Sequence, residues 1–151
     1  MGASITLDKA SLDHLNKQFE VLRQAGPRSV YSAIMKVAGK IVSDAKLRLK
    51  GRGHVVTSRL RNSLFIKTAM KPTDNYSDND GKSFTAELAT VTLSKNEVAI
   101  GTNVEYAQKI EDRDSYLQWA VQNVDLSKSL AEDVKQNLEN AMRYGLGILP
   151  K

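Results

Sequence analysis

The sequence of 151 residues contains no cysteine and only two histidines, His14 and His54. The absence of cysteine excludes disulfides, thiolate metal sites and cysteine nucleophiles, and two histidines are too few for a histidine-rich metal centre. No apolar run approaches the roughly 18 residues that a membrane-spanning helix needs, and the first residues lack the basic and then apolar pattern of a signal peptide. We therefore expect an intracellular soluble protein without a membrane partner.

The two histidines offer little material for catalysis. His14 lies in a predicted helix, away from its apolar stripe, where a histidine is typically a solvated surface residue. His54 lies in a glycine-containing loop close to Thr57 and Ser58, whose hydroxyls are candidate nucleophiles. No acidic residue nearby in the sequence would orient its imidazole, as a nucleophile–base pair requires. We predict that the protein is not an enzyme and has no cofactor.

The middle of the chain partly matches a calcium-binding loop. Four of its residues fall at positions 3, 5, 6 and 12 of an EF-hand pattern, namely Asp78, Asp80, Gly81 and Glu87. Position 1 would be Tyr76, which has no carboxylate, and strands rather than helices are predicted on both sides. The same residue types are typical of turns. We therefore predict a turn and no metal site here, and we interpret residues 112–114 (Asp-Arg-Asp) as a solvated link between a strand and a helix.

The net charge of +5 is distributed unevenly along the chain. Residues 45–73 contain no acid and eight cations, at Lys46, Arg48, Lys50, Arg52, Arg59, Arg61, Lys67 and Lys71. Such a one-sided stretch attracts polyanions or acidic partner surfaces. Nucleic-acid binding through residues 46–71 is therefore an alternative function, in which lysine and arginine neutralise several phosphates. Against it, no aromatic residue precedes Phe65 in this segment, and no helix-turn-helix or RNA-binding motif is present.

The N-terminal third is predicted to form two helices. In residues 11–25, apolar side chains recur at spacings of three and four, at Leu12, Leu15, Phe19 and Leu22. Gly26 and Pro27 predict the end of this helix, and Pro27 suits the first turn of the next one. The second helix is predicted to reach Gly51, with an apolar stripe at Val30, Ile34, Val37, Ile41, Ala45 and Leu49.

The rest of the chain combines short strands with further helices. Thr57 is a candidate N-cap for a short helix in which Leu60 and Leu64 point inward while Arg59 and Arg61 point outward. Alternating and β-prone residues predict strands at residues 64–70, 84–93 and 98–101, with the last two antiparallel because only a four-residue turn joins them. Residues 71–82 are predicted to form a long mobile loop. Residues 116–124 and 126–145 have apolar residues at helical spacing and predict two final helices.

This order of elements predicts an α+β fold in a single domain of residues 1–151. Long N-terminal helices are expected to pack on one face of a small antiparallel sheet, with further helices at the C-terminal end. Residues 1–10 are interpreted as an N-terminal arm. Residues 145–151 are interpreted as an apolar tail that docks on the domain or on a neighbouring molecule.

Two blocks of this sequence resemble a family of tailed-bacteriophage proteins. Residues 57–64 (Thr-Ser-Arg-Leu-Arg-Asn-Ser-Leu) are similar to the block "Thr-Gly-x-Leu-Arg-x-Ser-hydrophobic" of neck or tail-completion proteins, with Ser58 at the position of the glycine. Residues 98–107 (Val-Ala-Ile-Gly-Thr-Asn-Val-Glu-Tyr-Ala) resemble the strand end of that family, and Glu111 falls where the family tends to carry a glutamate. The resemblance extends from about Val30 to Tyr144.

The resemblance implies a virion structural protein of a phage or prophage, without catalytic activity. Such proteins join or complete the tail at the head–tail neck, as a ring between the connector and the tail tube or its terminator, after assembly in the bacterial cytoplasm. In that setting the basic segment would face an acidic partner surface or DNA in the central channel, with contacts expected at Arg48, Lys50, Arg52, Arg59 and Arg61. Four motif residues would instead pack internally: Thr57, Leu60, Leu64 and Tyr106. Residues 71–82 and 146–151 are expected to become ordered on assembly.

Overall fold

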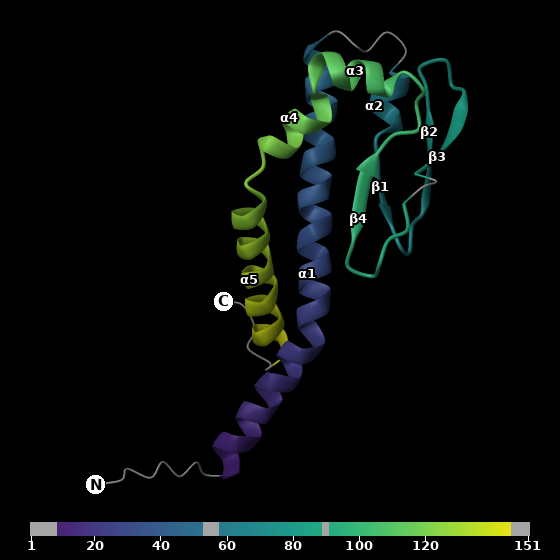
Figure 1. Ribbon diagram of the computed structural model, residues 1–151. Helices are drawn as coiled ribbons and strands as arrows, with labels where there is room; N and C mark the ends of the chain where they lie inside the picture. Colours follow the sequence, from purple (N-terminus) through teal and green to yellow (C-terminus); the bar gives the residue numbers. More distant parts are fainter. Residues whose placement is uncertain (1–8, 53–57, 89–90, 146–151) are drawn as a thin grey trace.

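A computed structural model describes residues 9–52, 58–88 and 91–145 of the chain (Figure 1). The elements follow in the order α1 (Lys9–Gly51), α2 (Arg59–Ser63), β1 (Phe65–Thr68), β2 (Thr73–Ser77), β3 (Ser83–Glu87), β4 (Val98–Gly101), α3 (Ala107–Asp114), α4 (Tyr116–Gln122) and α5 (Leu126–Gly145). The fold is therefore α+β, as predicted. His54, Thr57 and most of the two terminal segments lie outside the described residues.

Helix α1 is a single helix of 43 residues, so the predicted break at Gly26 and Pro27 is wrong. Pro27 lies inside the helix, where a missing N–H and a steric clash typically cost about 3 kcal/mol. Two residues later α1 contacts α5, because Ser29 is buried and its carbonyl accepts a hydrogen bond from Asn137 Nδ2 of α5 at 3.3 Å. Near the C-terminal end of α5, α1 changes direction (Figure 1), and proline is a common cause of such bends.

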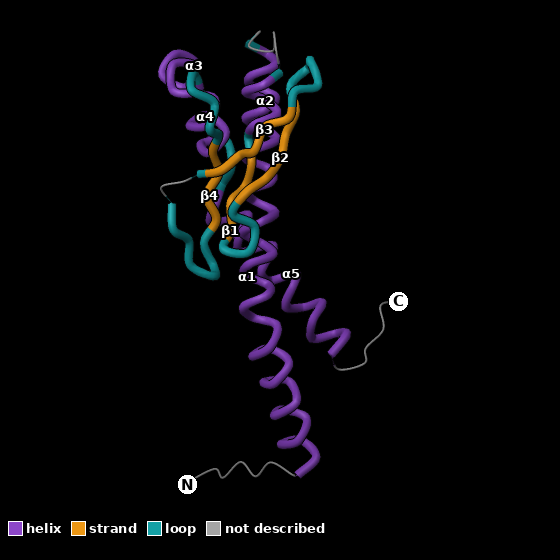
Figure 2. The backbone as a smooth tube through the Cα atoms, turned by 90° about the vertical axis from the view of Figure 1, so that its right-hand side faces the viewer, coloured by secondary structure: helices purple, strands orange, loops and turns teal. Residues whose placement is uncertain are grey.

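The core forms around the C-terminal two thirds of α1. Its predicted stripe is buried at Val37, Ile41, Ala45 and Leu49. Helices α4 and α5 lie along one side of α1, and the strands lie against its other side (Figures 1 and 2). Tyr116 is the largest fully buried side chain. The N-terminal part of α1 continues beyond the C-terminal end of α5 (Figure 1).

The strands form two separate two-stranded antiparallel sheets, not the single sheet that was predicted. β4 pairs with β1 in the register Phe65↔Gly101 to Thr68↔Val98, and not with β3, which precedes it in the sequence. β3 ends at Glu87, so the strand predicted over residues 84–93 is too long. The side chain of Leu88 instead covers Gly101, where an added Cβ would lie 2.8 Å from one of its methyl carbons.

The predicted mobile loop over residues 71–82 contains strand β2 and the turn of a hairpin, so that prediction is wrong. β2 pairs with β3 from Thr73↔Glu87 to Ser77↔Ser83, and the rings of Tyr76 and Phe84 stack across the pair at 5.3 Å. The Asp78 carboxylate accepts hydrogen bonds from the N–H groups of Asp80 and Lys82. Gly81 has a φ of 77°, which glycine adopts without strain. The interpretation of these acidic residues as turn formers is confirmed.

Helix α3 was missed, because residues 107–114 are polar and were interpreted partly as a solvated link. It ends at Ser115, whose N–H donates to the carbonyl of Glu111 at 2.7 Å and whose φ is 47°. The left-handed conformation of Ser115 redirects the chain immediately into α4. The predicted helices over residues 116–124 and 126–145 are confirmed as α4 and α5.

Candidate interaction surfaces

Three of the eight cations of the basic segment make contacts inside the molecule. The Arg48 guanidinium lies over the Trp119 ring, 4.9 Å from its centroid, and the Arg59 guanidinium lies 4.5 Å from the centroid of Phe84. Lys67 is buried, and its Nζ donates to the carbonyl of Leu88 at 2.8 Å. Arginine over an aromatic face gains stability from the ring's electrostatic field and covers its apolar surface. Two of the five predicted contact residues therefore hold structural elements together.

A smaller group of cations remains near the C-terminal end of α1. Lys50 and Arg52 are exposed there, and Arg61 of α2 is half-buried. Burial lowers the pKa of Lys46, and the charge of Arg61 lowers it further, while Asp74 acts in the opposite direction. Lys71 forms an ion pair with Asp74 at 3.0 Å and lowers the pKa of that carboxyl. Fewer cations are therefore available to a partner at the C-terminal end of α1 than the sequence indicated.

The two blocks that carry the phage resemblance lie against each other in space. The hydroxyls of Ser63 and Thr102 form a hydrogen bond, and β1 pairs with β4 immediately beyond them. Leu60 and Leu64 are buried, at 2% and 3% exposed, and Tyr106 is partly buried against the same core. The prediction that these three side chains pack internally is confirmed, whereas Thr57 lies outside the described residues.

Glu111 connects the second block to the following helix. Its two carboxylate oxygens accept hydrogen bonds from the backbone N–H groups of Leu117 and Gln118, each at 2.9 Å. A carboxylate at this position satisfies two of the unpaired donors in the first turn of α4 and complements the positive end of that helix. The role that this geometry gives Glu111 is to fix the α3–α4 junction.

The residues considered for chemistry do not come together in the described part of the chain. His14 is exposed on α1, and Gln18 Nε2 lies 3.1 Å from its ring nitrogen. Asp112 and Asp114 lie in α3, where they interact with Gln108 and Arg113 respectively. Over residues 9–52, 58–88 and 91–145, no group of three or more histidine, aspartate or glutamate residues is placed to hold a metal ion. No helix in these ranges is long and apolar enough to cross a membrane.

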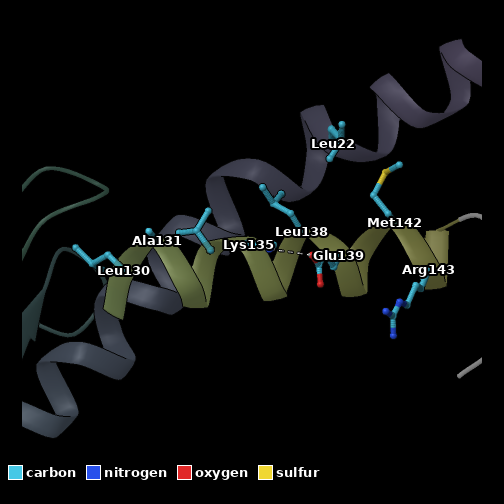
Figure 3. A pocket seen from close by; sticks show the side chains of 9 residues that line it. Leu22, Leu130, Ala131, Lys135, Leu138, Glu139, Met142 and Arg143 are labelled. Atoms are coloured by element: carbon cyan, nitrogen blue, oxygen red, sulfur yellow. Dashed lines mark ion pairs between the residues drawn. The ribbon is translucent and has the colours of Figure 1, made fainter. Parts of the chain in front are cut away.

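An open apolar groove, which the sequence did not indicate as a site, runs between α1 and α5 (Figure 3). Its volume is about 890 Å³, and it is lined by Leu22 of α1 and by Leu130, Ala131, Val134, Lys135, Leu138, Glu139, Met142 and Arg143 of α5. None of the residues Leu126–Gly145 is buried. The groove is therefore an apolar surface that the described chain leaves uncovered.

The groove stays open because α5 contacts α1 through a different face. Asn137 bonds the carbonyl of Ser29, and Asp133 pairs with Lys36. Gly145 lies so close to α1 that an added Cβ would be 2.9 Å from the methyls of Val21. These contacts of α5 are made by polar or small residues. Leu138 and Met142 line the groove, whereas Leu130 lines it and also packs against the core.

The apolar surface continues from the groove onto the free end of α1. Leu15 is 39% exposed and Phe19 is 61% exposed, about two helical turns and one helical turn before Leu22 respectively. Residues 9–25 of α1 are called the arm below, in place of the N-terminal arm that was predicted over residues 1–10. A helix length of about 1.5 Å per residue gives about 64 Å for α1 and about 30 Å for α5, so α5 is too short to cover the arm.

Comparison with known protein families, curated proteins and solved structures finds no match.

Proposed function

We propose that the protein is a structural subunit of a tailed phage or prophage virion, which joins or completes the tail at the head–tail neck by assembling into a ring. The observation that carries this proposal is the apolar surface formed by the arm and the groove. Exposed apolar residues on neighbouring helices can form a site for another protein chain. Most of the residues that line the groove are apolar, which supports binding of another apolar surface.

The sequence resemblance gives the proposal its biological setting. The two blocks that resemble neck proteins form one substructure around β1, β4 and α3, which gives the resemblance a spatial as well as a sequential order. That substructure is held by buried side chains and by the Glu111 cap, and it supports a role as a rigid building block. The arm and the exposed cations Lys50 and Arg52 project away from it and are available to partners.

The direct test is deletion of the gene from the phage or prophage that encodes it, followed by electron microscopy of the lysate. We expect DNA-filled heads and separate tails that are not joined, and we expect purified protein to restore joining when added to this lysate. An unrelated protein of the same net charge, added to the lysate in the same amount, is the control. Complete, infectious virions in the absence of the gene would contradict the proposal.

A second candidate function is binding of nucleic acid at the C-terminal end of α1. Its support is the exposure of Lys50 and Arg52 beside the half-buried Arg61. Duplex binding by these cations would fall steeply with salt, with a slope of about 0.9 per phosphate contacted. Charge reversal of Lys50 and Arg52 should abolish it, whereas reversal of Lys17 on the arm should not. An absence of duplex binding at about 50 mM salt would exclude this function.

A further inference from the structure

The arm cannot bury its apolar stripe against its own chain. It belongs to the continuous helix α1, and it projects beyond the C-terminal end of α5 (Figure 1). Leu22 already lies at the end of the groove, beside Leu138 and Met142 (Figure 3). Leu15 and Phe19 lie further out along the same straight segment and would have to reverse direction to reach the groove. Among the described residues, no element covers them.

The arm is apolar where the groove is apolar, and it is long enough to span the groove. It presents exposed apolar side chains at Leu15 and Phe19, one helical turn apart, which is a spacing found in helices that bind in apolar grooves. Its 17 residues extend about 25 Å, and the α5 side of the groove from Leu130 to Met142 extends about 18 Å. The exposed stripe is also continuous with the α1 face that packs on α5 within the chain. A second arm in the groove would extend that helix–helix interface by one more helix.

Charge at the two surfaces does not oppose this contact. On the arm, Arg23 pairs with Glu20 at 2.9 Å, and beside the groove, Lys135 lies 3.9 Å from Glu139. Each surface therefore carries a neighbouring acid and base rather than charges of one sign. When two copies meet, either pair can exchange partners across the contact without leaving a like-charge pair.

We propose that the arm of one copy of this chain docks in the groove between α1 and α5 of the next copy. The contact joins two different surfaces, so each copy both donates an arm and receives one. Repetition of such a heterologous contact gives a closed ring when the rotation between copies closes, and an open filament when it does not. The statement that the assembly closes rests on the proposed function, whereas the contact itself rests on the geometry above.

The size of the contact sets its strength. A helix about 10 Å wide in contact over about 18 Å covers far less than the roughly 800 Å² per partner that is typical of a stable pair. A single arm–groove contact is therefore weak, and the protein is monomeric when dilute. In a closed assembly each copy makes two such contacts, so the fraction of assembled copies increases steeply with protein concentration.

Sedimentation velocity over a range of concentrations tests the contact. We expect wild-type protein to self-associate. We expect Phe19→Glu in the arm or Leu138→Glu in the groove to raise the protein concentration at which half of the copies are associated by at least about tenfold, because each variant buries a carboxylate in an apolar contact. Lys17→Gln and Gln136→Glu serve as matched controls. They change the charge by the same amount at exposed positions on the arm and on α5, and they should associate as wild type does.

Mixing the two defective variants separates this contact from its alternatives. Phe19→Glu retains a groove and Leu138→Glu retains an arm, so an equimolar mixture should form heterodimers and nothing larger. Association of Leu138→Glu alone would indicate an arm–arm contact, association of Phe19→Glu alone would indicate a groove–groove contact, and either result overturns the proposal. Circular dichroism establishes that each variant is folded, and Met142→Glu replaces Leu138→Glu if the latter unfolds.

The remaining outcomes also decide the question. Wild-type protein that stays monomeric at every concentration overturns the proposal, as does association only after residues 146–151 are removed, which would mean that the tail occupies the groove. If arm and groove variants assemble as wild type does, this contact is wrong while the proposed neck function stands. If the contact is verified but virions form without the gene, the neck function is wrong while the contact stands.

Discussion

At the scale of single residues, backbone strain is concentrated at two serines. Ser58 and Ser115 have φ values of 54° and 47°, in the left-handed region. This region costs an L-residue about 1–2 kcal/mol but costs glycine almost nothing. Ser58 occupies the position at which the resembled phage family carries glycine. The conformation gives a physical reason for glycine there, namely that the chain must turn sharply into α2.

Replacing Ser58 tests this explanation. We expect Ser58→Gly to be more stable than Ser58→Ala by about 1 kcal/mol, because only glycine relieves the left-handed strain while both changes remove the hydroxyl. The hydroxyl accepts a long hydrogen bond of 3.4 Å from Arg61 Nη2, whose loss is common to both variants. Chemical denaturation of the two variants measures the difference. Equal stabilities would mean that position 58 is not strained.

A second residue-scale prediction concerns Tyr116, which is only 1% exposed. Burial, together with the nearby charge of Glu111, raises the pKa of Tyr116 to about 12. The folded state therefore holds the phenolic proton more tightly than the unfolded state, whose tyrosine titrates near the ordinary value of about 10. The stabilising effect is present in full below pH 10 and is lost as the pH rises from about 10 to about 12.

The pH dependence should disappear when the phenol is removed. We expect the free energy of unfolding of wild type to fall by about 2 kcal/mol more than that of Tyr116→Phe between pH 10 and pH 12. Denaturant unfolding of both proteins at several pH values measures this difference. Parallel pH profiles for wild type and variant would show that Tyr116 ionises normally in the folded state.

At the scale of elements, the α3–α4 junction depends on one carboxylate. Glu111 accepts the N–H groups of Leu117 and Gln118, so Glu111→Ala should lower the free energy of unfolding by about 1–2 kcal/mol, which is typical for loss of a helix cap. Glu111→Gln retains one acceptor and should lose about half as much. Asp112→Ala, on an exposed side chain of the same helix, is the control. An unchanged midpoint for Glu111→Ala would show that water replaces the carboxylate.

The elements show which parts of the fold follow from local pattern. Apolar periodicity predicted α4, α5 and the C-terminal part of α1. A helix that packs through one face needs apolar residues every three or four positions, as at Val37 and Ile41. Periodicity did not predict that α1 continues through Pro27, and the contact that α1 makes just beyond it is with Asn137 of α5, more than a hundred residues away. The partner of β4 was also unpredictable locally, because strand pairing depends on non-local contacts such as that of Leu88 with Gly101.

The candidate surfaces were predicted only in part, for a related reason. The basic segment can be identified from the sequence. The contacts of Arg48 with Trp119 and of Arg59 with Phe84 cannot, because these residues are far apart in the sequence. The apolar residues of the groove were identified only as apolar residues at helical spacing. The groove is open because α5 contacts α1 through another face, whereas the arm is exposed because α1 and α5 differ in length, 43 and 20 residues. Comparing the lengths of neighbouring amphipathic helices is the signal that would have found this surface.

At the scale of the whole molecule, the two candidate surfaces should respond differently to salt. The arm–groove contact is apolar, so self-association should change little from about 50 to about 500 mM salt, whereas any binding of a polyanion at Lys50 and Arg52 should weaken strongly. Sedimentation velocity and duplex-binding titrations at matched salt concentrations measure the two effects. Self-association that is abolished by salt would mean that charged residues, not the groove, hold the copies together.

Helix α1 contains Pro27 and changes direction near the C-terminal end of α5 (Figure 1), which gives the molecule a built-in adjustment. Because the arm is a rigid lever of about 27 Å between Pro27 and Lys9, a change of about 10° at the bend moves its tip by about 5 Å. A proline bend lacks one of the hydrogen bonds that would resist such a change. If copies assemble through the proposed arm–groove contact, such a change would keep the same side chains in register while the spacing between the cores varies, so one sequence would fit assemblies of slightly different diameter.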